Sequence, residues 1–179
     1  PTAEGVLRRH LGICYDVCHA AVEFENPTQN ISDLDAAGIA IAKLQLSSAI
    51  RVPEVTPAAL DVLGRFDEPG YLHQVVEKRG DQYFRYLDLP EAFAAAADSS
   101  HGEWRIHFHV PVFLEQLPGL GTTQYFLREI LQLHRSRPLS THLEVETYTW
   151  DVLPPEHRNV TVAGAIAREL LWVKDVIES

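Results

Sequence analysis

The sequence predicts an α/β protein with a parallel sheet that is either doubly wound or a barrel. Short apolar runs at residues 11–15, 39–46 and 142–147 fit buried strands. Helical patterns precede, separate and follow these runs. Alternation of this kind is typical of a parallel sheet with right-handed crossovers.

Local signals predict the other elements. Residues 4–10 resemble the last turns of a helix, and Ser32 is a suitable N-cap for a helix over 33–38 that stops at Gly38. Residues 71–89 predict a hairpin that turns at 78–81. Further helices are expected within 53–66, at 90–97, from a Thr122 or Thr123 cap to about 137, and at 160–177, and a further strand at 104–110.

As a barrel, the chain supplies about the last three strands of a (β/α)8 TIM barrel, and residues 1–179 are the carboxyl-terminal part of that one domain with an insertion at about 48–103. Three strands cannot close a barrel, so we expect the amino-terminal half to come from the same or another chain. The chain begins at Pro1 and has no methionine, which suggests a fragment or a processed piece.

Composition excludes several classes of protein. The formal charge is −10, with 15 Lys and Arg against 25 Asp and Glu, which disfavours nucleic-acid partners. No apolar run reaches the roughly 20 residues of a membrane span. The two cysteines, Cys14 and Cys18, are too few for a disulfide framework, and we expect reduced thiols in a cytoplasmic protein.

Polar residues gather at or just beyond the ends of the apolar runs, where barrel enzymes place their reacting groups. Each has an ordinary alternative: a helix cap, a surface histidine or a salt-bridged carboxylate. Together they include the ligand types of a divalent metal, and we expect the Asp, His and Glu side chains to face one cavity. The residues are Asp16, His19, Gln45, Ser47, Ser48, His107, His109, Glu144 and Glu146.

Four stretches carry a resemblance to a known superfamily. "GICYDVCHA" resembles the Asp-x-x-His strand end of the xylose isomerase-like TIM barrels, which include sugar isomerases, epimerases and the endonuclease IV type. "KLQLSSA", "HFHVPVF" and "LEVETYTW" resemble later parts of the same barrels. Within this superfamily, the chain is most similar to the bacterial EboE family of metabolite-traffic proteins.

The resemblance implies roles for individual residues. It makes Asp16, His19, His107, His109 and Glu146 ligands of a divalent Zn, Mn or Mg ion. It also makes Glu146 and His19 the catalytic groups. Glu146 would be the proton-transfer base, and His19 would be a second metal ligand or a substrate contact.

Gln45 and Ser47 are expected to bind substrate. Gln45 stands where most members of the superfamily have a metal-binding His. This difference leaves open which metal is bound and whether the chain is catalytic. An amide oxygen favours Mg²⁺ or Mn²⁺, whereas histidine ligands favour Zn²⁺.

The function expected from the resemblance is a metal-dependent sugar or sugar-phosphate isomerase or epimerase of the EboE kind, acting on a small metabolite that is a sugar or a phosphorylated compound. Two alternatives stay open. One is a metabolite-binding or carrier protein without catalysis, and the other is a metal-dependent phosphoesterase of the endonuclease IV type.

Overall fold

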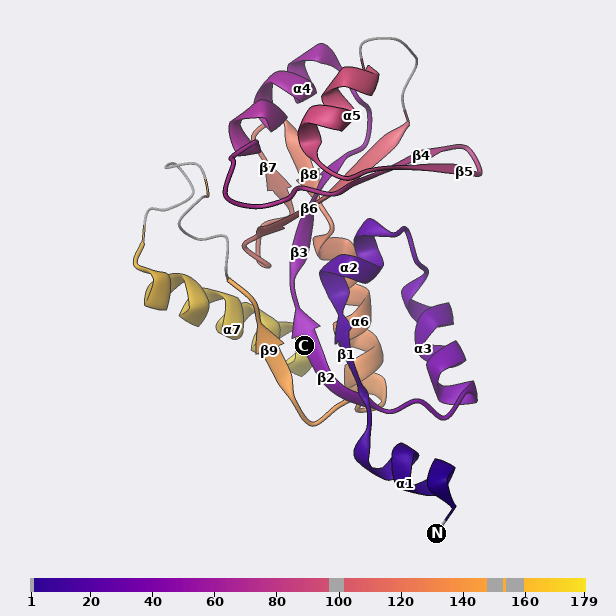
Figure 1. Ribbon diagram of the computed structural model, residues 1–179. Helices are drawn as coiled ribbons and strands as arrows, with labels where there is room; N and C mark the ends of the chain where they lie inside the picture. The colour runs from indigo at the N-terminus through magenta and orange to yellow at the C-terminus, as the bar shows by residue number, and fades with distance from the viewer. Residues whose placement is uncertain (1, 97–101, 148–152, 154–159) are drawn as a thin grey trace.

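The computed structural model describes residues 2–96, 102–147, 153 and 160–179, and its strands form two sheets (Figure 1). One is a parallel sheet in the order β1-β2-β9, and the other is an antiparallel sheet in the order β5-β4-β6-β3-β8-β7. The strands are β1 (Ile13–Asp16), β2 (Ile41–Leu46), β3 (Ser48–Val52), β4 (Val75–Arg79), β5 (Gln82–Tyr86), β6 (Glu103–Val110), β7 (Gln116–Leu117), β8 (Leu120–Thr122) and β9 (Leu143–Val145).

Most helices lie close to the ranges that the sequence predicts. The helix at Val17–Val22 was not predicted, and the helix expected over 33–38 begins at Pro27, with Asn26 and not Ser32 as its N-cap. Most helices begin at a residue whose side chain accepts a backbone N–H, as with Asn26 before Pro27 and Thr56 before Pro57. The helices are α1 (Ala3–His10), α2 (Val17–Val22), α3 (Pro27–Ala36), α4 (Pro57–Leu63), the 3-10 turn η1 (Gly64–Phe66), α5 (Leu89–Ala96), α6 (Gln124–Ser136) and α7 (Val162–Glu178). Among these helices, none is long and apolar enough to cross a membrane.

The parallel sheet packs one face against helices. Leu44 and Leu46 of β2 are buried together with Phe126 and Leu127 of α6, in a core to which α3 and α7 also contribute. In the register of the sheet, Asp16 lies beside Gln45 and Gln45 beside Glu144. The carboxyl ends of the three strands therefore meet at one edge.

A single residue joins the two sheets. β2 ends at Leu46 and β3 begins at Ser48, so the chain passes from the parallel sheet into the antiparallel sheet through Ser47. β3 pairs antiparallel with β6, and its first residue, Ser48, lies opposite Val110, the last residue of β6. The carboxyl end of β6 is thus brought down to the carboxyl edge of the parallel sheet.

The antiparallel sheet has its own core. Trp104 and Phe108 of β6 are buried with Leu63 of α4 and Leu89 of α5, and these two helices cover the sheet in Figure 1. The β4–β5 hairpin turns at Gly80, whose φ of 57° lies in the left-handed region that favours glycine. The hairpin forms one end of the sheet.

The predicted TIM barrel is wrong. The chain is a mixed α/β fold in which a six-stranded antiparallel sheet stands beside the three parallel strands, and such a sheet is not a segment of a (β/α)8 barrel, whose strands are all parallel. The barrel pattern fails directly after β2, where β3 follows in place of a helix. The expected insertion at 48–103 also differs, because the antiparallel sheet extends beyond it to Thr122 of β8.

Candidate metal centre

Asp16 organises the turn from β1 into α2. Its Oδ1 accepts hydrogen bonds from the backbone N–H groups of Cys18 (2.9 Å) and His19 (3.3 Å), which caps the helix. The same oxygen accepts a hydrogen bond from the Ser47 hydroxyl at 3.0 Å. This capping fixes Cys18 and His19 in the first turn of α2, directly above the edge of the parallel sheet.

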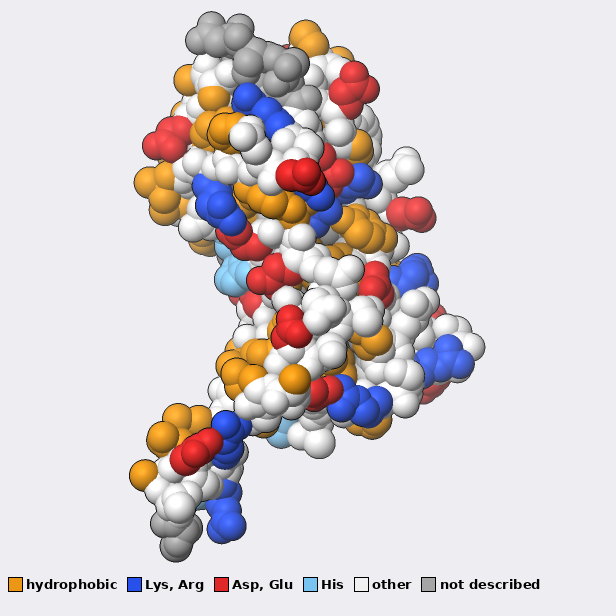
Figure 2. Space-filling model, turned by 90° about the vertical axis from the view of Figure 1, so that its right-hand side faces the viewer, with side chains coloured by type: hydrophobic (Ala, Val, Ile, Leu, Met, Phe, Trp, Pro, Cys, Tyr) orange, Lys and Arg blue, Asp and Glu red, His pale blue; other side chains and the backbone are white. Residues whose placement is uncertain are grey.

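Three histidines meet at this edge. The Nε2 atoms of His19 and His107 are 3.1 Å apart. His109 follows His107 by two residues on β6, so both rings lie on the same face of the strand, with centroids 5.3 Å apart. In Figure 2, histidine atoms reach the surface in the narrow middle of the molecule, with acidic side chains next to them.

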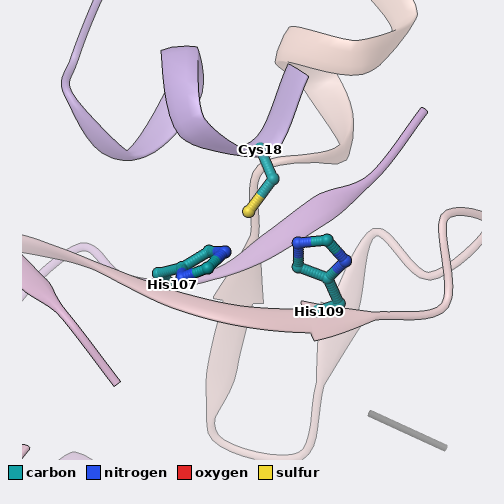
Figure 3. A group of neighbouring side chains, drawn as sticks. All are labelled: Cys18, His107 and His109. Carbon is teal, nitrogen blue, oxygen red and sulfur yellow. The ribbon is translucent and has the colours of Figure 1, made fainter. Parts of the chain in front are cut away.

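Cys18 completes a compact group of nitrogen and sulfur donors. Its side chain is fully buried, and its Sγ points between the rings of His107 and His109 (Figure 3). The ligand atoms of these three residues all lie within 4.8 Å of one another. No other group of three or more His, Cys, Asp or Glu residues with this spacing occurs in the part of the chain that the structure describes.

An oxygen atom lies behind each of the three histidines. Nδ1 of His107 is 3.1 Å from Gln74 Oε1, and Nδ1 of His109 is 3.4 Å from the main-chain oxygen of Glu146. Nδ1 of His19 lies 3.6 Å from Asp16 Oδ2. For His107 and His109, the acceptors at Nδ1 favour the tautomer that carries its proton there and its lone pair on Nε2, whereas Nδ1 of His19 is beyond hydrogen-bond distance of Asp16. Metal-binding histidines are commonly oriented in this way.

The two carboxyl groups at this edge are joined by an amide. Gln45 Nε2 donates a hydrogen bond to Asp16 Oδ2 at 3.2 Å and another to Glu146 Oε2. Burial raises the pKa of Glu146, and the nearby Asp16 adds to the increase, although the bond from Gln45 opposes it. The Gln45 amide therefore occupies the position between the carboxylates that a bridging cation would need.

Burial keeps the donor group uncharged. It lowers the pKa of His107 to about 4, an effect that the neighbouring His109 and His19 increase. It also lowers the pKa of His109 to about 4, although Asp16 opposes the shift. Burial raises the pKa of the Cys18 thiol well above 9. At neutral pH the two buried imidazoles are therefore neutral, which is the form that binds metals.

A cavity opens beside His19 and His107. It has a volume of about 510 Å³ and lies between α2 and the β4–β5 hairpin. Val22, Val75 and Leu87 are among the residues that line it. A small molecule in this cavity would therefore lie against two of the three histidines.

The structure brings the five predicted metal ligands together through the contacts of Asp16 with His19, His19 with His107, His107 with His109 and His109 with Glu146. Gln45 and Ser47, predicted to bind substrate, both hydrogen-bond to Asp16. Ser48 is buried in β3, and Glu144 is exposed beside Lys43.

Sequence reasoning missed Cys18 and Gln74. The first appeared to be an ordinary packed thiol, although its place between Asp16 and His19 at a helix start was a usable signal. Gln74 precedes β4, and nothing in its sequence context pointed to His107.

Comparison with known proteins identifies no relative, since no family model, curated protein or solved structure matches the chain.

Proposed function

We propose that the chain is a zinc-dependent enzyme acting on a small molecule, with Cys18, His107 and His109 as the zinc ligands and His19 beside them. The observation that carries the proposal is the convergence of these donors, with an oxygen behind Nδ1 of each histidine. Three protein ligands and an open position are typical of catalytic zinc.

The donor atoms favour zinc over magnesium or manganese. Thiolate and imidazole suit borderline-soft Zn²⁺, whereas Mg²⁺ and Mn²⁺ prefer oxygen. Donor atoms on a tetrahedral zinc are roughly 3.3 to 3.6 Å apart, from bond lengths of about 2.0 to 2.3 Å. The spacing within 4.8 Å is close to this range, so small side-chain rotations bring the three donors onto one ion.

The reaction class that suits the neighbouring groups is a proton transfer, as in isomerases and epimerases. Zinc supplies polarisation of a substrate carbonyl or hydroxyl. Glu146 is a suitable base, because its raised pKa lies closer to neutral pH than that of an ordinary carboxylate. His19 is exposed and lines the cavity, where it can contact the substrate.

One observation favours a second candidate, a metabolite carrier without catalysis. Gln45 donates hydrogen bonds to oxygens of both Asp16 and Glu146. The bonded Glu146 carboxylate is therefore less able to accept a proton than an unbonded one. A reducing compartment such as the cytoplasm suits either function, since Cys14 is an exposed thiol and Cys18 can bind a metal as a thiolate only while it is not oxidised.

Metal analysis tests the proposal. After dialysis against zinc, we expect one tightly held ion per chain by mass spectrometry. Co²⁺ in its place should give an absorption band from thiolate-to-cobalt charge transfer. Cys18→Ser should remove that band and His109→Gln should remove the ion, both with unchanged far-UV circular dichroism.

The matched control is His10→Ala, which removes an exposed histidine from the last turn of α1. It should keep the full zinc content. Equal loss of zinc in His10→Ala and His109→Gln, or a cobalt spectrum without the thiolate band, would contradict the proposed ligands.

A further inference from the structure

We infer that the cavity beside His19 and His107 takes a substrate with an apolar body and a metal-binding oxygen head group, rather than a polyhydroxylated one. The inference rests on the proposed zinc site, because the head group would bind there. It concerns the part of the ligand that extends away from the metal between α2 and the β4–β5 hairpin.

The walls of the cavity are mainly hydrocarbon. Val22 of α2 and Val75 and Val76 of β4 lie behind this wall and are nearly or fully buried. Among the apolar lining residues, Tyr86 and Leu87 at the end of β5 offer the exposed surface. Leu87 is 59% exposed although it is a large aliphatic side chain. An apolar ligand group would cover such a side chain and gain the free energy of removing both surfaces from water.

Several polar groups that line the cavity already have partners. Gln74 Oε1 contacts His107 Nδ1, and the Gln74 main-chain oxygen accepts a hydrogen bond from the His107 N–H at 2.8 Å. The Tyr86 hydroxyl donates to Glu77 Oε2 at 2.9 Å. A hydroxyl-rich ligand would have to compete with these bonds or leave some of its own hydroxyls without protein partners.

The charged residues of the cavity also pair with each other. Arg85 Nη2 donates to Glu23 Oε2 at 2.6 Å, and Arg85 Nε donates to the same oxygen at 3.1 Å. Both side chains are well exposed, so the pair forms a polar rim. A phosphorylated ligand would have to compete with the Glu23 carboxylate for Arg85, whereas an apolar tail passes the pair without breaking it.

A series of hydroxamates on the zinc-loaded full chain tests this inference, because all members share one metal-binding head group. The probes are acetohydroxamate, hexanohydroxamate and gluconohydroxamate, and the last two have carbon chains of equal length. Each buried methylene should tighten binding roughly fourfold. We therefore expect hexanohydroxamate to bind at least about tenfold tighter than acetohydroxamate by calorimetry, and gluconohydroxamate to gain nothing over acetohydroxamate.

Two substitutions test where the carbon chain of hexanohydroxamate binds. Leu87→Asp should remove most of the gain of hexanohydroxamate while leaving acetohydroxamate affinity and zinc content unchanged. Leu72→Asp is the control, since Leu72 is 54% exposed and is not among the residues that line this cavity. It should leave all three affinities unchanged.

The outcomes separate the inference from the proposed function. A chain that holds no zinc overturns both. A zinc-loaded chain that binds gluconohydroxamate as tightly as hexanohydroxamate, or in which Leu87→Asp has no effect, overturns the apolar substrate class alone.

Discussion

Replacing Glu77 by Gln should strongly destabilise the hairpin that forms one wall of the cavity. Glu77 lies on β4 with no exposed side-chain surface, and every hydrogen-bond partner around it donates. Arg79 donates from Nε at 2.7 Å and from Nη2 at 2.8 Å, the Tyr86 hydroxyl donates at 2.9 Å, and the Gly102 N–H donates at 3.1 Å. An amide would turn one acceptor into a donor that faces these groups.

The expected loss can be worked out from the same contacts. Burial alone would raise the pKa of Glu77, but the bonds from Arg79, Gly102 and Tyr86 outweigh it and lower the pKa from 4.5 to about 2. A shift of this size corresponds to about 3 kcal/mol, which agrees with the roughly 3 to 5 kcal/mol for removing one partner of a buried ion pair. In a chain of this length, that loss lowers the melting temperature by about 6 to 12 °C.

The sign of the pH dependence follows from the lowered pKa. Because the folded state holds Glu77 deprotonated more strongly than the unfolded state, its contribution is complete above about pH 4.5 and is lost as the pH falls toward 2. The difference in unfolding free energy between the native chain and Glu77→Gln should therefore shrink over that range. Urea unfolding at a series of pH values measures it.

Glu169→Gln is the matched control, because Glu169 is equally buried but its partners differ. Its Oε1 accepts from the Val112 N–H at 3.1 Å and its Oε2 from the Thr147 hydroxyl at 2.7 Å. A hydroxyl can accept as well as donate, so an amide fits. Burial raises the pKa of Glu169, so a neutral amide also removes a buried charge at neutral pH. We expect a change below about 1 kcal/mol, and equal losses in the two variants would refute the reasoning.

Two further substitutions test the neighbouring geometry. Asp16→Asn keeps an oxygen that can cap α2, because Asn is as good an N-cap as Asp. Its amide would face the Gln45 amide, so thermal unfolding should show a loss of about 1 kcal/mol, and metal analysis should still find one zinc per chain. Gly102→Ala would place a Cβ 1.7 Å from the Lys78 main-chain oxygen, so the backbone must move. Urea unfolding should show a loss of about 3 kcal/mol, and a loss below about 1 kcal/mol would contradict this contact.

Local patterns predicted most of the elements, apart from α2, β3 and the β7–β8 hairpin, but not their assembly. The hairpin at 71–89 was predicted from turn chemistry, and β4 and β5 lie within that range. The residues at 39–46 are mostly apolar, and from them a strand ending at Leu46 was inferred; apolar residues resume at 49–52. These residues form two strands in different sheets, joined at Ser47. Strand partners are chosen by contacts between distant segments, such as β3 with β6, and a single sequence does not contain that information.

The residues of the candidate site lie close together although the predicted fold is wrong, because several of them are placed by features close to them in the sequence. Asp16 both ends β1 and caps α2, which fixes His19. His107 and His109 share a face through the alternation of a strand. Their meeting depends on the antiparallel pairing of β6 with β3, which was not predicted. Cys18 was overlooked because its role depends on what lies opposite the helix rather than on its own spacing.

Gln45 is the reason that the proposed zinc site has fewer ligands than the sequence predicts. The sequence analysis assigns Asp16, Glu146 and the three histidines to one metal ion. The Gln45 amide instead donates one hydrogen to each carboxyl group, so the two acids lie side by side without a cation between them. The edge is thereby divided into an oxygen half, satisfied by hydrogen bonds, and a nitrogen and sulfur half around Cys18. A histidine in place of Gln45 would join the two halves, since its second nitrogen could bind a metal, whereas the amide keeps them separate.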